Sequence, residues 1–213
     1  MVRVRPSTIE LIQTLSTLDK PYFTTADLQR VLGLAGKSLA VTLGRLVAGG
    51  VLRRLRRNVY ALPIQAVDIE RIAQALRYPA YVSFESALAR HGLLSQLPYS
   101  VTLATTRPSA REIIAGRDVV YSHLPPALYW GYVTVNGLQL AEPEKALLDQ
   151  LYMVVNGHRS INISELDLRV LDRDKFAKYA ARFPRSISTL ANQARALIGT
   201  AALTGIHTGR IEL

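Results

Sequence analysis

The chain has 213 residues, of which 49% are hydrophobic and 20% charged. This composition is typical of a folded globular protein and excludes a chain that is mainly disordered. The absence of cysteine excludes a disulfide scaffold, a thiol nucleophile and cysteine-ligated zinc or iron–sulfur sites. Because the sequence shows neither a secretory signal nor a membrane span, we expect a soluble cytoplasmic protein.

The positive charge is concentrated near the start of the chain. Lys and Arg number 26 against 16 Asp and Glu, which gives a net charge of +10. Residues 1–63 hold 10 basic and 3 acidic side chains, whereas residues 64–213 hold 16 and 13. Such an excess is typical of a segment that contacts a polyanion. A basic surface that only keeps the protein soluble is the alternative.

The first part of the chain predicts three helices. Ser7 and Glu10 form a capping box at the start of one helix. Thr24 can cap a second helix, and after a turn at 33–36 a third runs over 37–48. Two helices joined by a short turn are typical of a helix-turn-helix.

A β-hairpin is predicted directly after the third helix. Residues 51–55 and 59–62 are rich in strand-forming side chains and flank a turn at 56–58. Asn58 can adopt a positive φ at this turn, where glycine would otherwise serve. A helix-turn-helix followed by such a hairpin is a winged helix.

The two faces of the third helix differ in character. At about 100° per residue, its apolar side faces the predicted core. That side carries Leu39, Leu43, Leu46 and Val47. The opposite side has no acidic residue that would repel phosphate, so we predict that it reads bases in the major groove. The predicted base-reading residues are Lys37, Ser38, Val41, Thr42 and Arg45. A merely solvated face is the alternative.

Four arginines crowd the tip of the predicted hairpin. Their mutual repulsion is unfavourable unless a counter-charge arrives, and DNA phosphates would supply it. Arg3 and Arg5 are interpreted as an N-terminal arm of the same kind. The residues predicted to contact the DNA backbone, or to form the wing, are Arg3, Arg5, Thr24, Thr25, Arg53, Arg54, Arg56, Arg57 and Asn58.

The remainder of the chain, after a linker predicted at 63–67, alternates helical and strand patterns. Predicted helices span 68–76, 83–91, 173–182 and 186–197. Predicted strands span 100–105, 118–121, 129–135 and 138–141. Ser83 is expected to cap the helix that follows it. Asn136-Gly137 is a strong hairpin signal between the last two strands, and residues from 199 onward are expected to be loose.

A further helix is predicted to begin at Pro143, because proline suits the first helical position. Glu144 and Lys145 are interpreted as a polar surface on its first turn. Asp149 lies four residues after Lys145, where the two side chains can pair.

No catalytic, cofactor or metal site is predicted. The four histidines show no metal-ligand spacing. Glu144 and Lys145 are adjacent at a helix start, which is not the spacing of a metal-dependent nuclease. A group-transfer site would need a Gly-Ser loop and paired aspartates, which the sequence lacks. We therefore expect a protein that is not an enzyme.

Three segments resemble the AbiEi family of antitoxins. They are YVSFESALARHGL at 81–93, VTLAT at 101–105 and AEPEKALLD at 141–149. Residues 57–63 fit as well, although the family usually has Gly where Asn58 stands. The order and spacing of these segments carry the resemblance, which covers residues 1 to about 153. Its motif residues here are Ser83, Glu85, Arg90, Glu144, Lys145 and Asp149.

This resemblance implies a bacterial or archaeal protein of a toxin–antitoxin and phage-defence system. Members repress their own operon through the winged helix, commonly at inverted repeats in double-stranded operator DNA. Their C-terminal domain antagonises a nucleotidyltransferase-like toxin, in many cases without a stable complex. We expect an α+β fold, with a winged helix-turn-helix at 1–63 and a mixed α/β antitoxin domain at 66–213.

Two alternatives stay open. One is a winged-helix transcription factor whose second domain senses a ligand or mediates dimerisation. The other is a protein-interaction module with an incidental basic face, for which weak DNA binding without sequence preference is expected.

Overall fold

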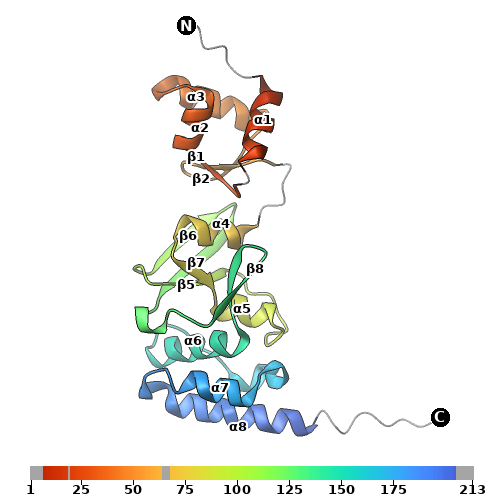
Figure 1. Ribbon diagram of the computed structural model, residues 1–213, viewed down its shortest axis with the longest axis vertical. Helices are drawn as coiled ribbons and strands as arrows, with labels where there is room; N and C mark the ends of the chain where they lie inside the picture. The colour runs from red at the N-terminus through yellow and green to blue at the C-terminus, as the bar shows by residue number, and fades with distance from the viewer. Residues whose placement is uncertain (1–6, 19, 64–67, 205–213) are drawn as a thin grey trace, which may run out of the picture. The chain divides into compact units, whose positions relative to one another are not determined.

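The computed structural model describes residues 7–18, 20–63 and 68–204, the last six of these by their backbone alone (Figure 1). The chain divides into two compact units, residues 1–73 with 113–117 and residues 74–112 with 118–213. The fold is α+β, as predicted: helices with a small antiparallel sheet come first, and a mixed six-stranded sheet with helices follows. The linker predicted at 63–67 falls largely on residues 64–67, which lie outside the described residues.

The N-terminal unit combines three helices with a three-stranded antiparallel sheet. The helices are α1 (Thr8–Thr17), α2 (Thr25–Leu32) and α3 (Gly36–Ala48). The strands, in sheet order, are β1 (Phe23–Thr24), β3 (Val59–Ala61) and β2 (Arg53–Arg56). β1 is a strand that the sequence analysis did not predict. It forms because Phe23 pairs with Tyr60 of β3, and both side chains are buried.

Local capping explains where the first two helices begin. The Ser7 N–H donates to the Glu10 carboxylate (2.7 Å), and the Glu10 N–H donates to Ser7 Oγ (3.2 Å), so the predicted capping box is confirmed. At α2 the Asp27 N–H donates to Thr24 Oγ1 (3.1 Å), and Asp27 accepts the Thr24 N–H in return (2.9 Å). Thr24 therefore caps α2, as expected.

The core of this unit forms where the three helices meet the sheet. Its buried side chains are Leu11, Leu15, Phe23, Leu28, Leu39, Leu43, Leu52, Tyr60 and Leu62. Leu46 and Val47 of α3 are partly buried against it. The apolar face predicted for α3 is thus the face that packs inward.

The second part of the chain is built on a mixed sheet with the strand order β6-β7-β5-β4-β9-β8. The strands are β4 (Ala80–Val82), β5 (Val101–Thr105), β6 (Ala110–Ile114), β7 (Arg117–His123), β8 (Tyr132–Val135) and β9 (Leu138–Ala141). β4 pairs with β5 antiparallel and with β9 parallel, and β5 pairs with β7 parallel. Asn136 (φ 50°) and Gly137 (φ 78°) both adopt positive φ between β8 and β9, which confirms the predicted hairpin turn.

Helices cover the sheet and then cover one another. They are α4 (Ile69–Leu76), α5 (Phe84–Arg90), α6 (Pro143–Val155), α7 (Arg173–Ala180) and α8 (Ser188–Thr204). Short 3-10 helices lie at Pro126–Leu128, Ile163–Glu165, Leu168–Val170 and Arg185–Ile187. α6, α7 and α8 lie one beneath another (Figure 1), and α6 also packs on α5. As a result α6 is covered by α5 on one side and by α7 and α8 on the other.

Three local predictions for this part were incomplete or wrong. Strands β4 and β6 were not predicted. β4 has only three residues and is held by pairing on both sides. The chain is not loose from residue 199, since α8 continues to Thr204. Ser83 occupies the N-cap position of α5, but its side chain makes no capping hydrogen bond because it is used elsewhere.

Within the residues that the structure describes, no single helix is long and apolar enough to cross a membrane. In the part of the chain that the structure describes, one pair of helices, α2 and α3, reaches the required length and hydropathy together, and the two are bent by 99°.

Candidate nucleic-acid interface

The geometry of α2 and α3 is that of a helix-turn-helix. The two helices are inclined by 99°, within the range of about 90–120° usual for this motif. The turn between them begins at Gly33, whose φ of 65° lies in the left-handed region that glycine adopts without strain.

The outer face of α3 is exposed as predicted. Lys37, Ser38, Val41 and Arg45 are all exposed, and Thr42 is half-buried at the edge. The apolar side chain of Val41 keeps 46% of its surface exposed on this face. The helix contains no acidic residue. The structure therefore brings the predicted base-reading residues together on one solvent-facing surface, the outer face of α3.

The hairpin β2–β3 forms the wing. Its strands pair antiparallel with a register shift between Arg54 and Arg56. Arg53, Arg54 and Arg57 are exposed, whereas Arg56 is half-buried. Three of the four predicted arginines are thus presented to solvent, and Arg56 is the least accessible of the group. Arg3 and Arg5, predicted as an arm, lie outside the described residues.

Thr24 and Thr25 join the helix-turn-helix to the wing. The Thr25 N–H donates to the Asn58 carbonyl (3.1 Å), and Thr25 Oγ1 donates to Asn58 Oδ1 (3.4 Å). Thr24 Oγ1 donates to Asp27 (2.7 Å) while it caps α2, so its proton is already used. The two threonines therefore hold the start of α2 against the wing turn.

A groove of about 530 Å³ separates α3 from the wing. On the side of α3 the groove is lined by Gly36, Ala40 and Gly44, which are four residues apart and share one face of the helix. Because their side chains are small or absent, they leave space beside the helix. Arg54 and Asn58 line the side of the wing. This groove was not predicted from the sequence, although the four-residue spacing of small side chains could have indicated it.

Asn58 is expected to set the stability of the wing turn through its φ of 62°. Asn58→Ala should destabilise the hairpin by about 1–2 kcal/mol, because a Cβ is disfavoured in the left-handed region. Asn58→Gly should destabilise it less, since glycine adopts this conformation without strain and both variants lose the same hydrogen bond from Thr25 Oγ1. Hydrogen exchange of the β2–β3 amides would measure both changes. Equal exchange rates in the two variants would contradict this account of the turn.

Three motif residues of the second part meet in a buried polar network with Tyr81. Lys145 pairs with Asp149, and its Nζ donates to Tyr81 OH (2.8 Å). The hydroxyls of Tyr81 and Ser83 each donate to Asp149 Oδ2 (2.8 Å). The predicted pairing of Lys145 with Asp149 is confirmed. Tyr81, which the sequence analysis did not single out, completes the network.

The interpretation of Glu144 and Lys145 as a polar surface is wrong. Glu144 is 2% exposed and Lys145 is fully buried, because α6 packs on α5 and is also covered by α7 and α8. The Lys145 ammonium lies 5.2–5.4 Å from the ring centroids of Tyr81, Trp130 and Phe183. Burial lowers the pKa of Lys145 and raises the pKa of Asp149.

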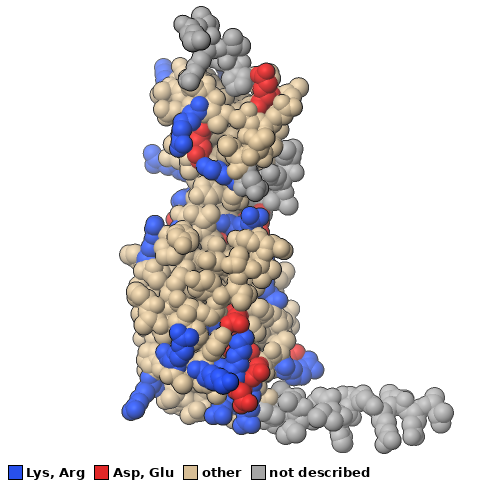
Figure 2. Space-filling model, in the orientation of Figure 1, with Lys and Arg blue, Asp and Glu red and all other residues tan. Residues whose placement is uncertain are grey.

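Glu144 joins a second cluster, which ties α7 to the start of α6. Lys175 Nζ lies 2.8 Å from Glu142 Oε1 and 3.2 Å from Glu144 Oε2. The Asp172 N–H also donates to Glu144 (3.1 Å). Although burial raises the pKa of Glu142, the hydrogen bond from Lys175 lowers it overall. Figure 2 shows basic and acidic side chains together over these helices.

The other two motif residues lie apart from both clusters. Glu85 of α5 pairs with Arg159 and accepts a hydrogen bond from Gln150 (3.0 Å). Arg90 is exposed at the end of α5. The six motif residues therefore do not form one site. Among the described residues, no group of three or more His, Asp or Glu side chains is placed to hold a metal ion.

The first unit is a winged helix-turn-helix, with an exposed, acid-free face of α3 and an arginine-rich wing. Residues 10–63 match the family model described as "Transcriptional regulator, AbiEi antitoxin". This match lies in the N-terminal region of the chain, and it names the same family as the AbiEi resemblance seen in the sequence.

Comparison with solved structures supports the fold of the whole chain. The RV2827C protein from Mycobacterium tuberculosis has a similar fold, with a TM-score of 0.62 and 14% sequence identity. The similarity covers 99% of this chain and 84% of that chain. At this identity the likeness concerns the fold alone. A comparison with curated protein sequences gives no match.

Proposed function

We propose that this protein is a DNA-binding antitoxin of a bacterial or archaeal toxin–antitoxin system. It represses its own operon and counteracts a nucleotidyltransferase-like toxin. The observation that carries the DNA-binding half is the exposed, acid-free face of α3 beside three exposed wing arginines, within a region that matches a regulator family. The proposed domains are the winged helix at 1–63 and the antitoxin domain at 66–213.

Base contacts and phosphate contacts are assigned to different elements. Arg45 and Lys37 donate to guanine in the major groove, and Val41 contacts a thymine methyl group. Arg53, Arg54 and Arg57 neutralise phosphates, which positions the helix without specifying sequence. The groove between α3 and the wing supports this assignment, because it leaves space for a sugar–phosphate backbone between the two elements.

Binding to the DNA upstream of the protein's own gene tests the repressor half. Fluorescence anisotropy should show affinity about 10³-fold higher than for scrambled DNA of equal length. The log–log dependence on salt should have a slope of about −0.9 for each phosphate neutralised. Equal affinity for both duplexes would contradict operator binding and favour the protein-interaction alternative.

Co-expression with the neighbouring gene tests the antitoxin half. The full chain should restore growth when that gene is toxic, and so should a full-length Arg45→Ala/Arg57→Ala variant expressed from an unrelated promoter. Rescue by this variant separates toxin antagonism from repression, because its DNA binding is impaired. A neighbour that is harmless on its own would remove the antitoxin assignment and leave the transcription factor with a ligand-sensing domain.

A further inference from the structure

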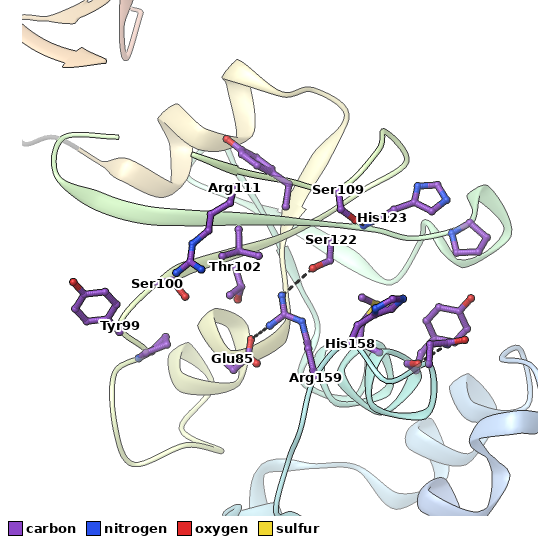
Figure 3. A pocket seen from close by; sticks show the side chains of 17 residues that line it. Glu85, Tyr99, Ser100, Thr102, Ser109, Arg111, Ser122, His123, His158 and Arg159 are labelled. Carbon is purple, nitrogen blue, oxygen red and sulfur yellow. Dashed lines mark hydrogen bonds and ion pairs between the residues drawn. The ribbon is translucent and has the colours of Figure 1, made fainter. Parts of the chain in front are cut away.

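The larger unit contains a polar pocket that the proposed function does not use. Its volume is about 920 Å³, near the upper end of the range of about 300–1,000 Å³ for small-molecule sites. Strands β5 and β7, the end of α6 and the turn after it supply the walls (Figure 3). We call it the sheet pocket.

The side chains that line the sheet pocket include two arginines and one carboxylate, so their net charge is positive. Arg111 and Arg159 line it with two histidines, His123 and His158, and the only carboxylate among the lining residues is Glu85. Glu85 is already engaged, because Arg159 pairs with it and Gln150 donates to it (3.0 Å). An incoming ligand therefore meets an excess of cationic and hydrogen-bond-donating groups, which favours an anion.

Arg159 is built into the centre of this pocket. Its side chain is only 11% exposed, and its guanidinium lies between Glu85 and Ser122, donating to Ser122 Oγ (2.9 Å; Figure 3). Ser109 Oγ accepts the N–H of His123 (3.0 Å). Both serine hydroxyls act as acceptors in these bonds, so each retains a proton that it can donate to a ligand.

Arg111 is held less tightly and lies at the edge of the pocket. Its guanidinium is paired with Asp118 through one nitrogen (3.1 Å), and the side chain is 68% exposed. Figure 3 shows it extending from β6 toward Ser100. The guanidinium of Arg111 therefore has unused N–H groups. They can bind an anion from the edge of the pocket while Arg159 contacts the same anion from the centre.

An aromatic side chain completes the rim. Tyr99 lines the pocket but is 84% exposed, with Pro98 beside it. A flat ring left in water next to a cationic pocket suits a planar group of the ligand, since stacking of a base on an aromatic ring contributes about 1–3 kcal/mol.

We propose that the sheet pocket binds a phosphate-bearing ligand with a planar ring, of the size of a mononucleotide. The phosphate lies against Arg111 and the inner hydroxyls, and the ring lies against Tyr99. The inference does not depend on operator binding or on the toxin, because all the lining residues belong to the larger unit.

Calorimetric titration of the full chain tests this proposal. The four ribonucleoside monophosphates are compared with adenosine, ribose 5-phosphate and inorganic phosphate. At least one nucleotide should bind with 1:1 stoichiometry, and at least ten-fold more tightly than each of these three controls. Affinity for adenosine equal to that for AMP would overturn the anionic assignment, and equal affinity for inorganic phosphate would overturn the planar ring. Failure of every nucleotide to bind at millimolar concentration would overturn the proposal as a whole.

Variants that are expected to change nucleotide affinity in opposite directions distinguish a specific effect from a general loss of structure. Arg111→Gln should weaken nucleotide binding at least ten-fold, whereas Arg173→Gln, which removes the same charge from the exposed start of α7, should leave it unchanged. Glu85→Gln should tighten binding about three-fold or more, because it frees Arg159 from its carboxylate. Equal affinities in the two arginine variants, or weaker binding in Glu85→Gln, would overturn the assignment.

Discussion

Replacement of Lys145 by methionine is expected to lower the free energy of unfolding of the larger unit by about 3–5 kcal/mol. The substitution keeps most of the side-chain volume but leaves the carboxylate of Asp149 buried without its cation. Two hydroxyl donors, from Tyr81 and Ser83, remain, and they do not neutralise the charge. Removing one partner of a buried ion pair therefore lowers the free energy of unfolding by more than the intact pair contributes to it.

A double-mutant cycle separates the charge from the packing. Asp149→Asn alone leaves the Lys145 ammonium unpaired, whereas the double variant Lys145→Met/Asp149→Asn removes both charges and keeps an acceptor for Tyr81 and Ser83. The double variant should therefore be more stable than the sum of the single effects predicts. Trp130 is the only tryptophan and lies 5.2 Å from the Lys145 ammonium, so its fluorescence during urea unfolding reports on this region.

An exposed lysine of α7 serves as the control for this cycle. Lys178→Met removes the same charge from the surface and should change stability by less than about 0.5 kcal/mol. If Lys145→Met were as mild as Lys178→Met, the buried pair would have no part in holding α6 to the sheet. Additive single effects would likewise contradict a direct interaction between the two charges.

The winged helix could be predicted from the sequence because its signals are local. The Ser7–Glu10 box, the Thr24 cap and the positive φ of Asn58 each depend on a few neighbouring residues. The amphipathic pattern of α3 also needs no knowledge of the rest of the chain, because a single core lies on one side of it. The groove beside α3 could also have been predicted, because the small residues Gly36, Ala40 and Gly44 share one face of the helix.

The buried network could not be predicted in the same way. A lysine and an aspartate four residues apart on a helix usually form a surface pair, and nothing local distinguishes Lys145 and Asp149 from that case. Their burial follows from α7 and α8, which cover α6 from later in the chain. Tyr81 and Ser83 reach the same network from β4 and the start of α5, more than 60 residues earlier. Strand β4 was not predicted for a related reason, because its three residues are held in the sheet by pairing with β5 and β9, which come later in the chain.

The sheet pocket could not be predicted from the sequence for the same reason. Glu85 lies on α5, Arg111 on β6 and Arg159 in the turn after α6, and only the folding of the whole unit gathers them. Glu85 was singled out by its motif, but its partner Arg159 lies 74 residues later, beyond the segments that carry the resemblance. Pairing over this separation explains why the six motif residues, read as one group in the sequence, divide into separate clusters in the fold.

Loss of Arg45 and loss of the wing arginines should weaken DNA binding in two different ways. Arg45→Ala is expected to cost about 1–3 kcal/mol on the native operator and to relax the preference at one base pair. Arg53→Gln/Arg57→Gln should weaken binding to every sequence alike and reduce the salt slope by about two, one for each phosphate that is no longer neutralised. Both wing residues are exposed, so neither change should disturb the core of the unit.

Binding to a panel of single-base operator variants at several salt concentrations would measure both effects. Lys178→Gln, which removes one charge from the other unit, controls for net charge in Arg45→Ala, and Arg173→Gln/Lys178→Gln does the same for the double wing variant. If the wing variant changed the order of preferred bases while Arg45→Ala left it intact, the roles of α3 and the wing would be reversed. Base specificity would then come from arginines of the wing entering the minor groove, where readout is largely limited to distinguishing A·T from G·C pairs.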